Sequence, residues 1–211
     1  MPPPNAIVGH RVKRIEDLPL LQGRGRFVDD LQFPGVLHAA FVRSPHGHAL
    51  IRGIDTGAAK KMPGVHAVFT LADFQNLLSQ ERLPLQFGGA KLPPDITPFV
   101  LAKDETSYVG ETVAMVIAES RPLAEDAAAA VAVDWEQLPA VSDCRDALKP
   151  GAPLAHRGRS SNLMLEIKQS YGDVAGAFSR APHRVSVNLK QHRGGAHSIE
   201  GRGALANYDG N

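Results

Sequence analysis

The side chains with the greatest chemical capacity gather near the end of the chain, in His192–Gly203. This stretch holds two histidines, two arginines, one glutamate and four glycines. Glycine lets a backbone approach a ligand closely, and an arginine guanidinium grips anions. The segment is therefore a candidate ligand-binding loop. The alternative is a solvent-facing loop held by pairing of Glu200 with Arg193 or Arg202, and the residue types alone leave both interpretations open.

The other polar motifs do not predict a catalytic or metal site. His46-Gly47-His48 places two imidazoles on one face of a strand, but no third ligand lies at metal-site spacing, so we expect a turn with hydrogen-bonded histidines. Gly23-Arg24-Gly25-Arg26 lacks the third glycine and the Lys-Ser/Thr ending of a phosphate loop, which favours a simple turn. Because no nucleophile motif and no paired carboxylates stand out, we assign no catalytic residue.

The composition is typical of a globular protein in a reducing compartment. Of 211 residues, 43% are hydrophobic and 21% charged, which allows a sizeable core. The net charge of +1 does not indicate a nucleic-acid or membrane-surface partner. The single cysteine, Cys144, cannot form an internal disulfide and is predicted to be a buried, unreactive thiol. Met1–Asn5 does not resemble a signal peptide and no apolar run approaches membrane-spanning length, so we expect a cytoplasmic protein without a transmembrane segment.

Hydrophobic alternation and turn residues predict an α+β fold over residues 20–145. The expected strands are 36–43, 49–55, 65–70, 113–118 and 131–135, and the expected helices are 57–62, 71–78 and one that Ser120 caps. The nearly unbroken apolar run of 113–118 indicates the central strand of a sheet. Four prolines and a Gly-Gly pair predict a loop over residues 81–99.

Two further segments flank this domain. Pro2 to Pro4 favour an extended arm over residues 1–19. Residues 146–211 begin with a linker and continue into a unit with a helix at 173–180 and strands at 184–191 and 203–208. The last strand is directed at an Asp209-Gly210 hairpin turn whose second arm is missing, which predicts an incomplete domain.

Short blocks spread along almost the whole chain carry a family resemblance. They are Val8–Asp17, Gln22–Asp30, Pro34–His38, Val42–Ala49, Met62–Val68, Tyr108–Ala114, Trp135–Pro139 and Gly172–Ala181. In order and spacing they resemble the large subunits of the xanthine oxidase family of molybdenum hydroxylases, especially the carbon monoxide dehydrogenase and bacterial aldehyde oxidase type. Residues 192–206 resemble that family's "x-E-x-R-G-x-x-A" loop, with Ser198 where proline is commoner.

The resemblance implies an α/β hammerhead domain over residues 20–145 and the truncated start of a molybdopterin-binding domain over 146–211. It implies oxidative hydroxylation with oxygen from water, at a molybdenum–molybdopterin cytosine dinucleotide in the full subunit. Electrons would leave through an iron–sulfur small subunit and an FAD-containing medium subunit. Glu200 and Arg202 become candidate supports beside the cofactor. The family's catalytic segments would follow Asn211, so this chain alone is expected to bind no cofactor and to be inactive, and its partner would include the rest of the large subunit.

Two alternatives stand beside this hypothesis. A truncated gene product would persist as a non-catalytic scaffold that docks the iron–sulfur or flavin subunits. An unrelated small α+β protein is the third interpretation, which the ordered blocks argue against. Continuation of the chain past Asn211 would discriminate the hydroxylase hypothesis from the non-catalytic scaffold. The substrate, whether an aldehyde, carbon monoxide or an N-heterocycle, is not encoded in these residues.

Overall fold

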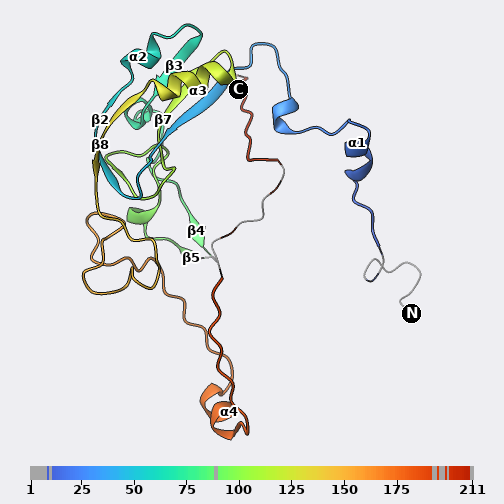
Figure 1. Cartoon of the computed structure of the whole chain (residues 1–211), viewed down its shortest axis with the longest axis vertical. Helices are drawn as coiled ribbons and strands as arrows, with labels where there is room; N and C mark the ends of the chain where they lie inside the picture. The colour runs from blue at the N-terminus through green and yellow to red at the C-terminus, as the bar shows by residue number, and fades with distance from the viewer. Residues whose placement is uncertain are drawn as a thin grey trace. The chain divides into compact units, whose positions relative to one another are not determined.

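The computed structural model describes residues 9, 11–87, 90–191, 194, 198 and 200–209. The chain divides into two compact units, Leu37–Ser179 and a second one made of Met1–Val36 with Arg180–Asn211. Every strand found in the described residues lies in Leu37–Ser179 (Figure 1). No helix in the described part of the chain is long and apolar enough to cross a membrane.

Two three-stranded antiparallel sheets form the centre of Leu37–Ser179. The first sheet has the order β1-β7-β3 and the second has the order β6-β2-β8. Their strands are β1 (His38–Arg43), β2 (Ala49–Asp55), β3 (Val65–Phe69), β6 (Glu105–Thr106), β7 (Thr112–Ala118) and β8 (Ala132–Gln137). Strands from distant parts of the sequence thus become neighbours, and the predicted α+β class is confirmed.

The central position predicted for residues 113–118 is confirmed by β7. It pairs with β1 on one side and β3 on the other, with Ala118 opposite both His38 and Val65. Four of its seven residues are buried. A strand flanked on both sides and covered on its faces needs apolar residues at consecutive positions, which explains its nearly unbroken apolar sequence.

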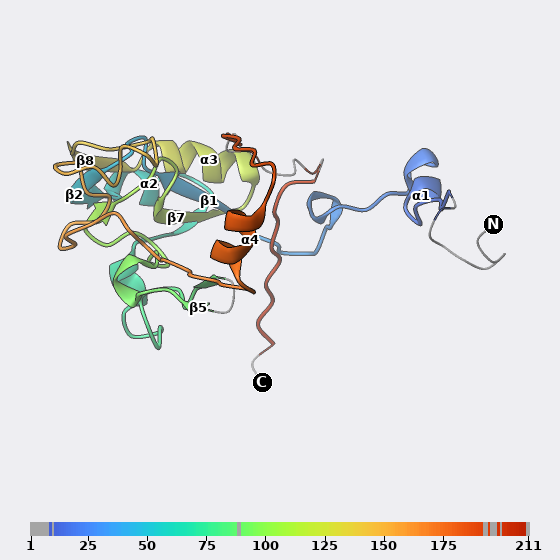
Figure 2. The ribbon, with the colours of Figure 1, turned by 90° about the horizontal axis from the view of Figure 1, so that it is seen from below.

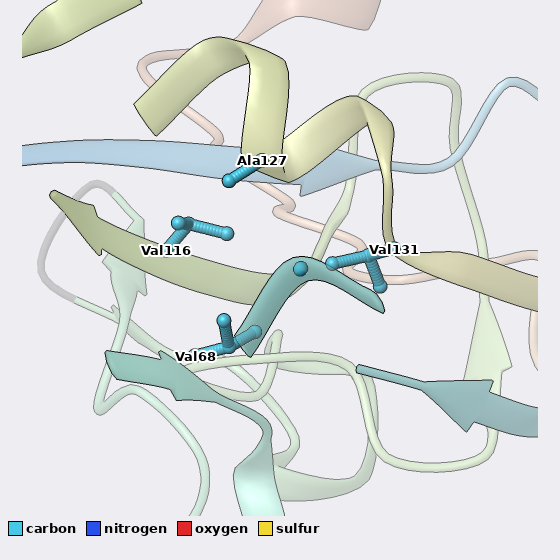
Figure 3. Packing of buried hydrophobic residues seen from close by; sticks show 5 residues of the cluster. Val68, Val116, Ala127 and Val131 are labelled. Atoms are coloured by element: carbon cyan, nitrogen blue, oxygen red, sulfur yellow. The ribbon is translucent and has the colours of Figure 1, made fainter. Parts of the chain in front are cut away.

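Helix α3 (Arg121–Ala129) covers one face of the β1-β7-β3 sheet (Figure 2). Its predicted start is confirmed, since the Ser120 hydroxyl accepts a hydrogen bond from Leu123 N at 3.5 Å and Pro122 lies in the first turn. Ala127 of α3 faces Val116 of β7, with Val68 of β3 and Val131 beside them (Figure 3). Small alanines on the helix let it approach the sheet closely.

The turn between α2 (Gly57–Lys60) and β3 depends on Gly64. Its φ of +78° is a conformation that L side chains rarely adopt, and a Cβ there would lie 2.8 Å from Leu123 Cδ1. Its carbonyl accepts a hydrogen bond from Glu119 N at 2.9 Å, which ties the turn to the end of β7. The glycine therefore serves both the turn and the approach of α3.

Several predicted elements in this unit differ from the structure. The helix expected at 71–78 is only a 3-10 helix, η2 (Leu71–Phe74). Its start is capped by Thr70 and Asp73, whose carboxylate accepts hydrogen bonds from Thr70 N and Oγ1. The loop expected at 81–99 contains two-residue strands β4 (Gln86–Phe87) and β5 (Ala90–Lys91) and the 3-10 helix η3 (Pro94–Ile96). Such short hydrogen-bonded pairs leave no periodic signal in a sequence. Helix α4 (Val174–Arg180) matches the expected helix at 173–180.

The second unit has little regular structure among its described residues. Helix α1 (Asp17–Leu21) interrupts the arm that was expected to be extended, and η1 (Val28–Asp30) follows it. The strands predicted at 184–191 and 203–208 are wrong, since the described residues there form no strand. Alternation of apolar and polar side chains favours a strand, but a strand forms only where another supplies hydrogen bonds, and no described residue pairs with these.

Candidate functional site

Glu200, one of the two predicted site residues, bridges two segments of its own unit. Its Oε1 accepts a hydrogen bond from Val28 N at 2.9 Å, across 172 residues of sequence. Val28 begins η1, and the first amides of a helix have no partner within it. The Ser198 hydroxyl donates to the Glu200 carbonyl at 2.5 Å and shapes the backbone at this point. The carboxylate thus supplies the acceptor that a helix start requires.

Gly203 lets the backbone near Glu200 approach Val28 closely, which the hydrogen bond between Glu200 and the Val28 amide requires. A Cβ at this position would lie 2.7 Å from Val28 Cγ1, so only glycine fits without a shift of the neighbour. Arg202 is exposed and, among the described residues, forms no ion pair with Glu200. His192, Arg193 and His197 of the predicted loop lie outside the described residues.

The side-chain contacts that the structure describes for the predicted loop are made within this chain. The one carboxylate of the predicted loop already faces a backbone amide of its own chain. A cavity of about 660 Å³ exists in the other unit, and neither Glu200 nor Arg202 lines it; its lining is residues 80–85, Leu92, Pro94, Thr97 and Phe99. No group of three or more metal-binding side chains occurs in the part of the chain that the structure describes. A supporting role of Glu200 and Arg202 beside a cofactor stays a prediction.

The cavity at residues 80–99 is mainly apolar. Arg82 stacks its guanidinium over the Phe99 ring, with Cζ at 3.9 Å from the centroid, and donates to the Thr97 carbonyl. Lys103 pairs with Glu81 at 2.8 Å nearby. Among the described residues, the charged groups at this cavity thus contact one another, the Phe99 ring and the backbone.

A polar cluster that the sequence did not predict lies where the β6-β2-β8 sheet meets the residues after β8. His48 is 5% exposed, and its Nε2 lies 2.7 Å from Glu105 Oε1 while its Nδ1 lies 3.2 Å from the Pro139 carbonyl. The predicted turn at 46–48 is confirmed, and so is the prediction of a hydrogen-bonded histidine for His48. The His46 ring instead packs edge-on against Trp135, with centroids 5.6 Å apart. The rest of the cluster was missed because its members are far apart in sequence.

Burial changes the acidity of three groups around this cluster. Desolvation raises the pKa of Glu111, although its carboxylate accepts a hydrogen bond from Ser107 N at 2.6 Å. Desolvation also raises the pKa of Tyr108, with Glu111 adding to the effect. For His156, desolvation lowers the pKa and outweighs the Glu105 carboxylate, which raises it, while Arg82 and Arg159 add to the lowering. Perturbed groups of this kind occur at structural ion-pair networks as well as at active sites.

Cys144 is exposed, so the prediction of a buried thiol is wrong. It lies in a turn where the Asp143 carboxylate accepts hydrogen bonds from the backbone N, Nε and Nη2 of Arg145. These contacts lower the pKa of Asp143 to about 2. Because the two charged neighbours stay in solvent and pair with each other, the cysteine between them is kept at the surface.

Comparison with known proteins places this fold in a family. Residues 22–139 match the model of the aldehyde oxidase and xanthine dehydrogenase a/b hammerhead domain. The chain is 44% identical over 203 residues to the nicotine 6-hydroxylase large subunit of Paenarthrobacter nicotinovorans, which covers 96% of this chain and 24% of that protein. It is 35% identical over 208 residues to the carbon monoxide dehydrogenase large chain of Hydrogenophaga pseudoflava, which covers 92% of this chain and 25% of that one.

Solved structures agree with the sequence comparison. Quinoline 2-oxidoreductase from Pseudomonas putida 86 superposes with a TM-score of 0.66 at 37% identity, over 82% of this chain and 21% of that one. The chain thus spans about a quarter of the length of the curated relatives it matches. The expected hammerhead fold and the family resemblance are both confirmed. The chain belongs to the aldehyde oxidase and xanthine dehydrogenase family and carries its a/b hammerhead domain over residues 22–139.

Proposed function

We propose that this chain is the N-terminal part of the molybdenum-binding large subunit of an oxidative hydroxylase. The observation that carries the proposal is the extent of the similarity, which continues beyond the hammerhead domain to 96% of the chain at 44% identity. Residues 1–19 are then an arm, 20–145 the hammerhead domain and 146–211 the linker and first part of the molybdopterin-binding domain.

The complete subunit would supply the chemistry. A molybdenum–molybdopterin cytosine dinucleotide, when bound, provides the two-electron oxidation that hydroxylates an aldehyde, carbon monoxide or an N-heterocycle. The relatives' names include a nicotine hydroxylase and a carbon monoxide dehydrogenase, which supports this range of substrates. Partner chains with iron–sulfur clusters and FAD would take the electrons onward, in the cytoplasm. Glu200 and Arg202 of this chain would support the cofactor from beside it, and Glu200 also holds the Val28 amide.

Uncovered apolar side chains support a partner for residues 163–209. Val185, Val187 and Leu189 alternate along one segment and are strongly exposed, Val185 by 92%. Tyr171, Val174 and Phe178, at and before α4, are exposed as well, and none of the described residues of 163–209 is buried. Apolar surface of this extent favours an interaction site. We propose that these side chains pack against the remaining part of the large subunit.

An affinity pull-down of the chain from its native host tests the proposal. The measurement is the intact mass of every retained chain, with metal analysis for molybdenum and iron. Retention of a chain carrying the remaining large-subunit sequence, together with both metals, is the expected result. Recovery of iron–sulfur or flavin subunits without molybdenum would instead favour the non-catalytic scaffold.

A pair of matched variants locates the contact. Val187→Asp places a charge on the uncovered segment and should abolish retention of the companion chain. Val109→Asp, at an exposed position in the loop before β7, should leave retention unchanged. Equal retention by both variants would contradict the proposed contact surface.

A further inference from the structure

Residues 140–162 follow β8 and lie beyond the part of the chain that matches the hammerhead model. They contain no helix or strand, and Figure 1 shows them as loops, coloured gold, near β2 and β8. Asn162 closes the last ten of them, Pro153–Asn162, into a loop that we call the strap. Its Nδ2 donates to the carbonyls of Ala147 and Pro153 at 2.9 and 2.8 Å, and its Oδ1 accepts from Ala155 N at 2.8 Å.

Glu105 of β6 is the main attachment point of the strap. Its Oε1 accepts hydrogen bonds from Arg157 N at 2.8 Å and lies 2.7 Å from His48 Nε2. The Arg157 guanidinium also forms an ion pair with the neighbouring Asp104, with Nη2 at 3.3 Å from Asp104 Oδ2. One partly buried carboxylate thus holds the sheet histidine and the strap together, and charge-assisted bonds of this kind are strong.

His156 is the second attachment point. Its Nδ1 lies 3.1 Å from the Ser107 hydroxyl, and the Ser107 amide donates to Glu111. Beyond that contact His156 faces one acidic group, Glu105, and three basic ones, Arg82, His48 and Arg159. Arg159 is in turn paired with Asp95 at 2.6 Å. Glu105 and Asp95 offset the basic groups around His156, so a positive charge there is disfavoured chiefly because the ring is half-buried.

We propose that the strap is an acid-sensitive latch, in which protonation of His156 releases Pro153–Asn162 from the hammerhead domain. In the closed state neutral His156 fits between Ser107 and the surrounding arginines. On protonation the imidazolium is disfavoured chiefly by burial, which exposure to water relieves. Glu105 partly offsets this cost, because its carboxylate favours the charged form. Opening breaks the contacts of Arg157 and His156 and frees the chain that leads to residue 163.

The sign of the pH dependence follows from the direction of the pKa change. Because the pKa of His156 is lowered in the folded state, its contribution is present above the value of about 6.5 for a free histidine. It is lost as the pH falls through the folded-state value. Glu111 acts in the opposite direction, since its raised pKa makes its ionised form the costly one. Asp95, whose pKa is lowered by its hydrogen bond with Arg159 of the strap, loses this ion pair only at and below the ordinary carboxyl range, so release between pH 7.5 and 5.5 is assigned to the histidine.

Hydrogen–deuterium exchange of the full chain, read by mass spectrometry from pH 7.5 to 5.5, tests the latch. With rates corrected for intrinsic exchange, protection in peptides covering 153–162 should fall with pH. The fall should begin near the free-histidine value of about 6.5 and level off below the folded-state pKa, with a slope of at most about tenfold per pH unit, as uptake of one proton allows. Peptides covering β7 should keep their protection, because the opening is local.

Two variants complete the experiment. His156→Asn keeps a side-chain group that can bond the Ser107 hydroxyl but does not titrate, so the pH dependence in the strap should disappear. His66→Asn is the matched control, since His66 is 48% exposed and lies near Glu119 rather than the strap. It should keep the wild-type slope. An unchanged slope in His156→Asn, or a parallel loss of protection in β7, would overturn the proposal.

Discussion

Truncation of Val116 to alanine is the sharpest test of the core described above. Val116 is 0% exposed in the middle of β7, between α3 and β3 (Figure 3). Removing two buried methyl groups costs about 1.6 kcal/mol in transfer free energy. The cavity left between the sheet and the helix brings the expected loss to about 2–3 kcal/mol. For a chain of this size that corresponds to a decrease of roughly 5–10 °C in Tm.

Thermal unfolding followed by circular dichroism, with urea unfolding in parallel, measures this loss. Val109→Ala makes the same chemical change at a side chain that is 66% exposed, and should cost less than about 0.5 kcal/mol. Val116→Thr keeps the β-branched shape but buries a hydroxyl, so it should also destabilise by about 1–3 kcal/mol. If Val116→Ala and Val109→Ala shifted the midpoint equally, the packing assigned to β7 would be refuted.

Three further substitutions probe individual contacts. Ser120→Ala removes the acceptor for Leu123 N and should cost about 1 kcal/mol in thermal unfolding, whereas Ser120→Asp should retain most of the stability. Gly64→Ala forces a side chain into a φ of +78° and should cost about 1–2 kcal/mol, and a neutral effect would contradict the turn geometry. Glu200→Ala leaves the Val28 amide without its acceptor, so exchange at that amide should accelerate while Glu200→Gln stays close to wild type. Equal exchange in both Glu200 variants would show that the carboxylate oxygen does not hold the amide.

The sequence predicted best those elements whose hydrogen-bond partners lie within the same domain. The run of 49–55 was found with its bounds, and 113–118 with its place in the sheet, because each contains a run of apolar residues that is buried in the structure. Ser120 with Pro122 marked the start of α3 through local capping chemistry, which short sequence windows contain. Short sequence patterns thus predicted the features that hydrophobic burial along one strand or capping of one helix determines.

Contacts between distant residues could not be predicted in this way. The polar cluster joins His48, Glu105, Pro139 and Arg157, and no spacing rule connects these positions. The Val28–Glu200 bond likewise spans 172 residues. Cys144 was misassigned because the frequency with which cysteine is buried says nothing of the Asp143–Arg145 pair on either side of it. Tertiary contacts decided each of these cases.

The strand patterns at 184–191 and 203–208 present a different case, since the pattern is present but the strand is not. Val185, Val187 and Leu189 are spaced as one face of a strand, yet they are strongly exposed. A single extended segment gains neither ladder hydrogen bonds nor burial of that face, so nothing offsets the entropy lost on ordering it. Residues 49–55 have a comparable apolar content and form β2 because β6 and β8 pair with it on both sides. The difference between the two segments is therefore the presence of neighbouring strands and not the sequence, and this is the physical reason to seek a partner polypeptide for the second unit.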